Sequence, residues 1–260
     1  MEQKRWYVEG KVLCAGIQKA VSRTEEPILC LMKEDKITLV AVSGLRLVVS
    51  WEAQLREPVP GNLVFLIPPL VAELLSSEAI CTQVGIELAL QGQSVMVRLT
   101  DHLGSYEFRW KSDFSTFSGP EAFAQLIQVP HTLVTVPHLR FSDATHQAVA
   151  KLGYMHVDQQ ISPAKLAILI DLDFGRLLVN GQEIFTTESR HYYFDPRLVI
   201  RALEFQREAT LRVGITPLAG TKRGYLSLLS SDGDWTVHCA LMSIDRDTQQ
   251  LYPLPPGRNR

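Results

Sequence analysis

Hydrophobic and polar residues follow a plan that occurs twice along this chain. The first copy is Lys36–Val49, KITLVAVSGLRLVV, in which an apolar run reaches a Ser-Gly break and a second apolar run follows, interrupted by one arginine. The second copy is Leu166–Gly181, LAILIDLDFGRLLVNG, with Asp-Phe-Gly at the break and one arginine after it. Short apolar runs on either side of a tight turn are typical of paired strands. The repeat therefore predicts two copies of one fold in the chain.

Each copy is followed by a short helix that begins at a proline. These helices are expected in IPPLVAELL, around Pro68, and in FDPRLVIRAL, around Pro196. Proline suits the first helical position because the N–H that it lacks would have no partner there. A longer helix is predicted over Leu13–Arg23, where apolar residues recur at helical spacing and Lys19 and Arg23 lie on the opposite side.

The remaining elements repeat the same order in both halves. Strands of the first half are expected near Trp6–Gly10, Lys36–Trp51 (a pair), Leu63–Ile67, Val84–Leu90, Ser94–Thr100 and Ser105–Trp110. The second half is expected to contain a strand at Thr132–Val136, helix Phe141–Leu152, strands to about Thr187, helix Asp195–Glu208, and strands near Thr210–Thr216, Tyr225–Leu229 and Trp235–Met242.

Chain length and composition agree with two globular domains. The chain has 260 residues and 29.2 kDa, more than most single domains. Hydrophobic residues make up 46% and charged residues 21%, and no apolar run approaches the roughly 20 residues of a membrane helix. The N-terminus has no apolar signal core, so we expect a cytoplasmic protein. The formal net charge of −2 does not indicate nucleic-acid binding, which would depend on local charge placement.

Sequence patterns of enzymes and metal sites do not occur. Asp173-Phe174-Gly175 spells a kinase tripeptide, but its glycine-rich loop, catalytic loop and strand lysine are missing. Asp171 and Asp173 alternate at the end of a strand, where they could hold a metal or form a solvated turn. The cysteines lie far apart, as expected of buried reduced thiols: Cys14, Cys30, Cys81 and Cys239. We expect a non-enzymatic protein without a cofactor or metal.

The longer segments can be compared with a known family. In the first half they are AVSRTEEPIL, KITLVAVSGLRLVV, the Pro68 helix and a strand-rich stretch ending in FRWKSDFSTFSGPE. In the second half they are TLVTVPHLRFSDATHQAV, FDPRLVIRALEF and DWTVHCALMSI. These sets resemble the middle and C-terminal domains of the bacterial DNA polymerase III beta sliding clamp, over most of residues 10–244. Ser43 and Leu45 depart from the family's Thr-Asp-Gly-His-Arg-Leu turn, and a tail follows Ile244.

The resemblance implies an α+β fold of two tandem DNA-clamp-type domains, with antiparallel sheets and two helices in each. The domains are expected at 1–125 and 126–245, with a linker within Lys111–Gln128 and a disordered tail at 246–260. Clamps of this family have three domains per chain and dimerise, and by this resemblance the chain would lack the first domain. Three copies would supply six domains, as in the two-domain clamps of other lineages, so the resemblance implies a homotrimer.

A ring around duplex DNA needs only a diffuse positive field on its inward helices. The residues expected to face DNA are Lys19, Arg23, Lys151, Arg197, Arg201 and Arg207. The same four helices carry acidic residues, so the positive bias is slight: Glu73, Asp143, Asp195, Glu204 and Glu208. For the helix that begins near Pro196, the alternative is an exposed helix whose charges pair with one another.

The second implied site is a partner groove. In the family, short peptides of polymerases and clamp loaders dock in an apolar pocket made by the glycine-containing turn and the last strand. Carried over by position, the groove residues are Gly44, Arg46, Leu47, Pro130, Met242 and Ile244. Leu45 departs from the family's residue, but its apolar side chain suits such a pocket, so it is expected in the groove as well. Leu47, Met242 and Ile244 could instead be plain core residues of strands.

Two functions therefore remain open. The first is a DNA sliding clamp or processivity factor that encircles duplex DNA, docks peptides of a polymerase or repair protein and has a clamp loader as a further partner. The second is a clamp-fold adaptor that binds partners without encircling DNA.

Overall fold

The computed structural model describes thirteen stretches of the chain. They are residues 4–8, 10–21, 26–43, 47–77, 86–91, 93–100, 105–114, 133–151, 168–173, 176–179, 182–185, 190–218 and 223–244. Within them, the strand pairings are antiparallel and four helices are present, so the expected α+β class is confirmed. The expected tail, 246–260, and most of the expected linker lie outside the described residues.

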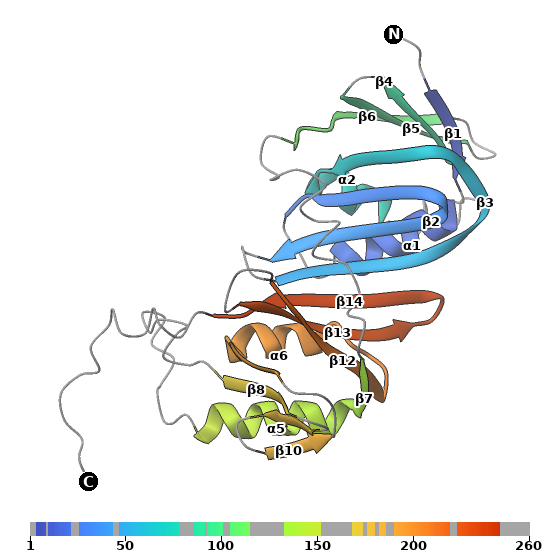
Figure 1. Cartoon of the computed structure of the whole chain (residues 1–260). Helices are drawn as coiled ribbons and strands as arrows, with labels where there is room; N and C mark the ends of the chain where they lie inside the picture. Colours follow the sequence, from blue (N-terminus) through green and yellow to red (C-terminus); the bar gives the residue numbers. More distant parts are fainter. Residues whose placement is uncertain are drawn as a thin grey trace, which may run out of the picture. The chain divides into compact units, whose positions relative to one another are not determined.

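The chain forms two compact units (Figure 1). Unit 1 holds Met1–Gln128 together with Ser231–His238, and unit 2 holds Val129–Ser230 and Cys239–Arg260. The hairpin tip at 231–238 therefore groups with the N-terminal half of the chain, although its sequence lies more than 100 residues further on. The domain limits expected from the sequence do not place residues 231–238 with the first domain. The assignment of two clamp-type domains to 1–125 and 126–245 stays a prediction.

Among its described residues before Gln128, unit 1 contains two helices and six strands. The helices are α1 (Gly10–Val21) and α2 (Pro69–Leu75). The strands are β1 (Lys4–Val8), β2 (Ile28–Ser43), β3 (Leu47–Ile67), β4 (Ile86–Gln91), β5 (Ser94–Thr100) and β6 (Ser105–Lys111).

The two long strands of unit 1 form a ribbon that turns back on itself. Figure 1 shows β2 curving sharply midway, and Glu34 has a φ of 54°, which fits a tight turn. Residues 28–33 pair with 62–67, and residues 36–43 pair with 47–54. The sequence predicts the pair within Lys36–Trp51 and the strand Leu63–Ile67 but misses residues 28–35. Their apolar run leads into the charged sequence KEDK, which hides the strand signal.

Both faces of this ribbon are buried over much of its length. On one face, Leu29 and Val40 of β2 form a cluster with Val48 and Leu66 of β3. The residues of β2 that alternate with these point to the opposite face of the strand, and several of them are also fully buried. They share the interior with one stripe of α1 and with the inner side of α2: Leu13, Cys14, Ile17, Ala20, Cys30, Met32, Ile37, Leu39, Ala72 and Leu75. At 25 cal/mol per Å² or so, this apolar burial is the main source of stability of the unit.

A second sheet of unit 1 has the strand order β1-β4-β5-β6. It is tied to β3 by Trp110, whose Nε1 donates a hydrogen bond to the carbonyl of Leu66 at 2.6 Å. The amide of Leu66 donates in turn to Ser112 Oγ at 2.8 Å. The rings of Trp110 and Phe65 lie with their centroids 6.1 Å apart, which adds an aromatic contact.

Unit 2 contains the helices α5 (His138–Lys151) and α6 (Pro196–Glu204), which contact one another. One sheet has the order β10-β9-β8-β11, built from β8 (Ile168–Asp173), β9 (Arg176–Val179), β10 (Gln182–Phe185) and β11 (Arg190–Phe194). The remaining strands lie wholly or partly in unit 2: β7 (Val134–Pro137), β12 (Thr210–Pro217), β13 (Gly224–Asp232) and β14 (Trp235–Met242). Strand β12 pairs with β7 on one side and β13 on the other.

Some helix limits differ from those expected. Helix α1 (Gly10–Val21) begins three residues before Leu13, and the expected end at Arg23 lies outside the described residues. Helix α6 ends at Glu204, not at Glu208, because a C-cap forms at Phe205. Helix α5 begins at His138. Such shifts of a few residues reflect capping geometry, which periodicity does not report.

Candidate functional site

Lys19 was the clearest candidate for a DNA contact on α1. Residues Leu13, Ile17 and Ala20 form the buried stripe of this helix, which leaves Lys19 near the opposite side and half-buried. Its Nζ lies 2.6 Å from an Oδ of Asp232, the last residue of β13 before the turn to β14. The two side chains are 27% and 22% exposed. The charge of Lys19 is therefore balanced inside unit 1 rather than presented alone to solvent.

The same hairpin tip reaches the backbone of α1 at Gly16. A β-carbon built on Gly16 would meet the indole of Trp235 and would lie 2.7 Å from Leu39 Cδ1. Gly16 and Trp235 are both buried. Gly233, with a φ of 64°, allows the tight turn that carries Asp232 and Trp235. Glycine is thus required at position 16 for close approach, and the contact positions Asp232 for its ion pair.

Arg197, at the start of α6, is paired in a different way. Asp195 caps the helix by accepting a hydrogen bond from the Arg197 amide at 3.0 Å. The two oxygens of the same carboxylate accept from Arg197 Nε at 3.1 Å and from a terminal nitrogen at 2.8 Å. This hydrogen bonding raises the pKa of Arg197, so the guanidinium stays charged but faces a neighbouring negative charge. This pair joins the N-cap to a helix residue two positions on and is not a pair between two residues of α6, so the alternative of a helix whose charges pair with one another stays a prediction.

The other residues expected to face DNA have different positions. Arg201 is exposed on α6, three residues before the exposed Glu204. Arg207 is exposed but lies beyond the end of the helix. Lys151 is the last residue of α5, and its side chain is not among those described; Arg23 lies outside the described residues. Lys19 belongs to unit 1 and Arg197, Arg201 and Arg207 belong to unit 2, so their assignment to one DNA-facing surface stays a prediction.

Large apolar side chains are exposed on two of the helices. Leu70 and Leu74 lie one turn apart on α2 and are 70% and 45% exposed. In unit 2, Leu139 near the start of α5 is 70% exposed. Leucine contributes no charge that would attract phosphate, so these helix surfaces are less suited to DNA than the basic residues alone suggested. Periodicity could not reveal this, because leucines at helical spacing usually indicate a core stripe.

Only part of the expected groove falls within the described residues. Gly44, Leu45, Arg46 and Pro130 lie outside them. Leu47 opens β3 and is fully buried, which is the environment of a strand-core residue. The groove therefore remains a prediction.

The C-terminal groove candidates lie at the end of β14 in unit 2. Met242 is the last residue of that strand and is half-buried. Ile244 follows it, is 8% exposed and donates its backbone N–H to the carbonyl of Tyr193 in β11 at 2.7 Å. Ser243 donates to the Gly224 carbonyl at 2.8 Å, and its Oγ accepts from the Gly224 amide. The chain is thus held tightly through Ile244, and Met242 keeps surface available for contact.

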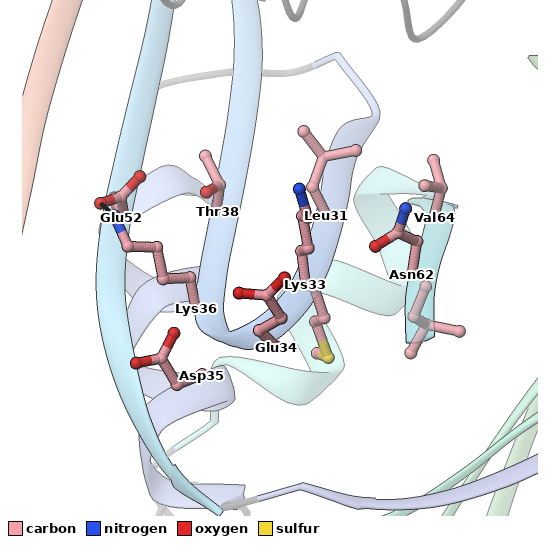
Figure 2. A pocket seen from close by; sticks show the side chains of 11 residues that line it. Leu31, Lys33, Glu34, Asp35, Lys36, Thr38, Glu52, Asn62 and Val64 are labelled. Carbon is pink, nitrogen blue, oxygen red and sulfur yellow. Dashed lines mark hydrogen bonds and ion pairs between the residues drawn. The ribbon is translucent and has the colours of Figure 1, made fainter. Parts of the chain in front are cut away.

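One depression on unit 1 was not foreseen from the sequence (Figure 2). It has a volume of about 660 Å³ and lies beside the turn of β2. Leu31 and Val64, which are half-buried partners across the ladder, form its apolar part. Charged residues surround them: Lys33, Glu34, Asp35, Lys36 and Glu52. The sequence carries no signal for this depression, because the depression arises where β2 turns back on itself.

The described histidines, cysteines and carboxylates determine which metal and thiol chemistry this part of the chain can support. Among these, no group of three or more His, Cys, Asp or Glu side chains could hold a metal ion. Asp171 and Asp173 belong to β8 rather than to a turn beyond it. Cys14, Cys30 and Cys239 are buried and form no disulfide, and burial raises the pKa of both Cys30 and Cys239. In the described part of the chain, no helix is long and apolar enough to span a membrane.

Comparison with known proteins relates the chain to solved structures alone. No family model and no curated protein matches it. A putative DNA polymerase III beta subunit from Eubacterium rectale aligns with a TM-score of 0.62 and 10% identity. The DNA polymerase III beta chain from Streptococcus pneumoniae aligns with a TM-score of 0.60 and 12% identity. Each alignment covers 94% of this chain and 66% of the other, so the chain spans less than two thirds of those proteins.

A structure of A. fulgidus PCNA, bound to the C-terminal region of FEN-1, also aligns. Its TM-score is 0.52 at 12% identity, and the alignment covers 93% of this chain and 98% of that one. Identities this low establish the architecture and leave function to other arguments. The chain therefore has the fold of the DNA sliding clamps, as its sequence resemblance implied.

Proposed function

We propose that this chain is a DNA sliding clamp or a processivity-factor-like scaffold without catalytic activity. The observation that carries the proposal is the sliding-clamp fold over 94% of the chain. A clamp acts by topology, because a closed ring cannot leave duplex DNA sideways. Its affinity for DNA would be weak, sensitive to salt and independent of sequence.

The proposed assembly is a homotrimer. A likeness in fold to PCNA along nearly its whole length supports a two-domain subunit, and three such subunits would supply six domains. Pairing of edge strands between subunits would also cover edges that otherwise promote aggregation. Duplex DNA would pass through the ring, and exposed Arg201 and Arg207 are candidates for contact with its phosphates.

Partner docking is the second part of the proposal. An extended peptide with spaced leucine and phenylalanine side chains would insert between Leu45, Leu47, Pro130, Met242 and Ile244. The bound FEN-1 region in the PCNA structure supports such docking, since it is a terminal segment held by a protein of this fold. Two or three apolar anchors at roughly 1.5–3 kcal/mol each, less the ordering cost, would give micromolar affinity. A polymerase, repair protein or clamp loader would supply the peptide.

Three observations favour the alternative of a clamp-fold adaptor. Lys19 is paired with Asp232, Arg197 is paired with Asp195, and α2 exposes Leu70 and Leu74. An inner surface with neutralised cations and exposed leucines would hold DNA weakly. A protein of this kind would keep the partner site without encircling DNA.

The deciding measurement is the mass in solution, by light scattering and sedimentation, from micromolar to high micromolar concentration. The clamp predicts a species of three times 29.2 kDa. It also predicts slower loss from circular than from linear duplex after loading, because only open ends release a ring. A strict monomer over that range contradicts the closed ring and supports the adaptor.

The groove is tested separately by titrating a clamp-binding peptide and following NMR shifts. Met242→Ala should weaken binding while leaving the mass unchanged, since the groove and the ring edges are different surfaces. Absence of shifts at both Leu45 and Met242 at millimolar peptide would contradict the groove for either function.

A further inference from the structure

The depression beside the turn of β2 has no role in either proposed function. Its apolar part consists of Leu31 and Val64, and Thr38 and Asn62 add a hydroxyl and an amide. A volume of about 660 Å³ lies within the range of roughly 300–1,000 Å³ of ligand sites. Figure 2 shows side chains from the two arms of β2 and from β3 around this one hollow. It can therefore receive more than one side chain of a ligand.

The charged side chains at the rim give the depression a net negative charge. Lys36 lies 2.8 Å from Glu52, so this pair is already neutralised. That leaves Lys33 against two carboxylates, Glu34 and Asp35, all of which are exposed. Among the described residues, neither Lys33 nor Glu34 forms an ion pair. The unbalanced charge at the β2 turn is negative, and a ligand that joins an apolar group to a cationic group matches it.

The chain itself contains a segment with this composition. Residues 251–260 read LYPLPPGRNR, with apolar side chains at Leu251, Tyr252 and Leu254, two arginines, and no acidic residue. Its prolines favour an extended backbone, so less conformational entropy is lost on binding than for an ordinary segment. We infer that residues 251–260 of a second copy of the chain bind in the depression beside the β2 turn.

Spacing along the two partners supports this match. Leu31 and Glu34 are three residues apart, and at about 3.3 Å per residue of strand the apolar and acidic parts are about 10 Å apart. Leu254 and Arg258 are four residues apart, which gives about 12 Å in an extended polyproline conformation. The side chain of Leu254 can thus contact Leu31 and Val64 while the guanidinium of Arg258 reaches the carboxylate of Glu34 or Asp35. Contacts of guanidinium with carboxylate are among the stronger hydrogen bonds available.

The consequence is self-regulation through a surface that the DNA and partner sites do not use. An occupied depression would hold the C-terminal segment of another copy on unit 1, and a competing basic peptide would release it. The chain's own segment is favoured over an outside peptide because every copy of the protein supplies one segment for each depression.

The experiment uses the full chain and a fluorescent synthetic peptide of residues 249–260. The host protein carries Leu251→Ser, Leu254→Ser, Arg258→Glu and Arg260→Glu, so that its own segment does not compete. Anisotropy at low salt should show saturable binding to this host. Glu34→Lys with Asp35→Lys in the host should weaken binding at least tenfold.

Matched controls separate the depression from general electrostatics. Glu73→Lys with Asp234→Lys makes the same change in charge at two exposed carboxylates elsewhere in unit 1 and should leave affinity within twofold. A peptide with Arg258→Glu and Arg260→Glu should bind the Glu34→Lys, Asp35→Lys host better than the parent peptide does. If Glu34→Lys or Asp35→Lys prevents folding, Asn62→Arg blocks the hollow from β3 and should also abolish binding.

Competition in the unmodified protein tests the identity of the occupant. The labelled peptide should bind the parent chain at least tenfold more weakly than the host, and dependence of this difference on protein concentration indicates binding between copies. Equal binding to parent and host contradicts occupancy by the chain's own segment. Equal binding of a scrambled peptide, equal loss in the charge control, or no binding at millimolar peptide would each overturn the inference.

Discussion

The indole of Trp235 lies against the backbone of Gly16 in α1, leaving no space for a side chain there. A β-carbon at position 16 would be 2.8 Å from Trp235 Cζ2 and 2.7 Å from Leu39 Cδ1. One turn further along the helix, Lys19 meets Asp232 of the same hairpin, 213 residues later in the sequence. The hairpin tip is therefore part of the interior of unit 1.

Gly16→Ala should destabilise the protein, although alanine is the better helix former. At an open helical position the change would stabilise by roughly 0.5–1 kcal/mol. Here the added methyl forces the indole or Leu39 to move, and overpacking of this kind costs about 1–3 kcal/mol. Urea unfolding measures the difference.

The Trp235→Ala background provides the control for this prediction. With the indole removed, Gly16→Ala should be neutral or stabilising, which gives a positive coupling energy between the two sites. Additive effects of the two changes would show that the indole does not restrict position 16.

Asp232→Asn should strengthen binding of linear duplex DNA at low salt, if the chain binds DNA through α1. The substitution frees the ammonium of Lys19 from its partner at 2.6 Å, and one more phosphate contact increases the slope of affinity against salt by about one. Asp234→Asn makes the same change in net charge at an exposed residue nearby and serves as the control. Equal affinities of the two variants over a salt series would remove Lys19 from the DNA surface.

Asp195→Ala should lower the free energy of unfolding by about 1 kcal/mol, because it removes the cap of α6. Asp195→Asn keeps a capping oxygen and should cost less than half as much, while losing the charge that holds Arg197. Thermal or urea unfolding of both variants separates capping from ion pairing. If the two substitutions cost the same, the ion pair matters more than the cap.

Stability should decrease with pH above about 9, in part because of Cys239. Burial raises the pKa of this thiol from 9.0 to about 12, while a hydrogen bond from Gln206 acts in the other direction. Between these values the unfolded chain has lost a proton that the folded chain retains. The free energy of unfolding therefore falls with rising pH, by at most about 1.4 kcal/mol per pH unit for this group.

Cys239→Ser removes the titrating thiol and should flatten the decrease between pH 9 and 12. The readout is urea unfolding over that range, with the difference in slope between parent and variant attributed to Cys239. Identical slopes would mean that the native thiolate is not disfavoured. Thiol reagents should likewise fail to modify Cys239 at pH 8 unless the protein is unfolded.

Much of the secondary structure could be predicted because its cause is local. The strands expected at Ser94–Thr100 and Trp235–Met242 match β5 and β14, since alternating apolar residues are read directly from the sequence. The buried stripe of α1 follows from helical spacing in the same way. The arm of β2 at 28–35 has no clear local signal, because its apolar run leads into the charged residues KEDK. Its pairing of residues 28–33 with 62–67 joins segments far apart in the chain, and such pairing has no local signature.

The chain's sequence by itself determined the repeat, the helix and strand types, and a resemblance that identified the fold. Tertiary structure alone decided which charges stay available, because Lys19 is neutralised by a residue that no periodicity connects to it. It also decided that Gly16 must lack a side chain and that Leu70 and Leu74 face solvent. Local patterns select the elements, whereas the neighbours that each side chain meets depend on how distant segments pack.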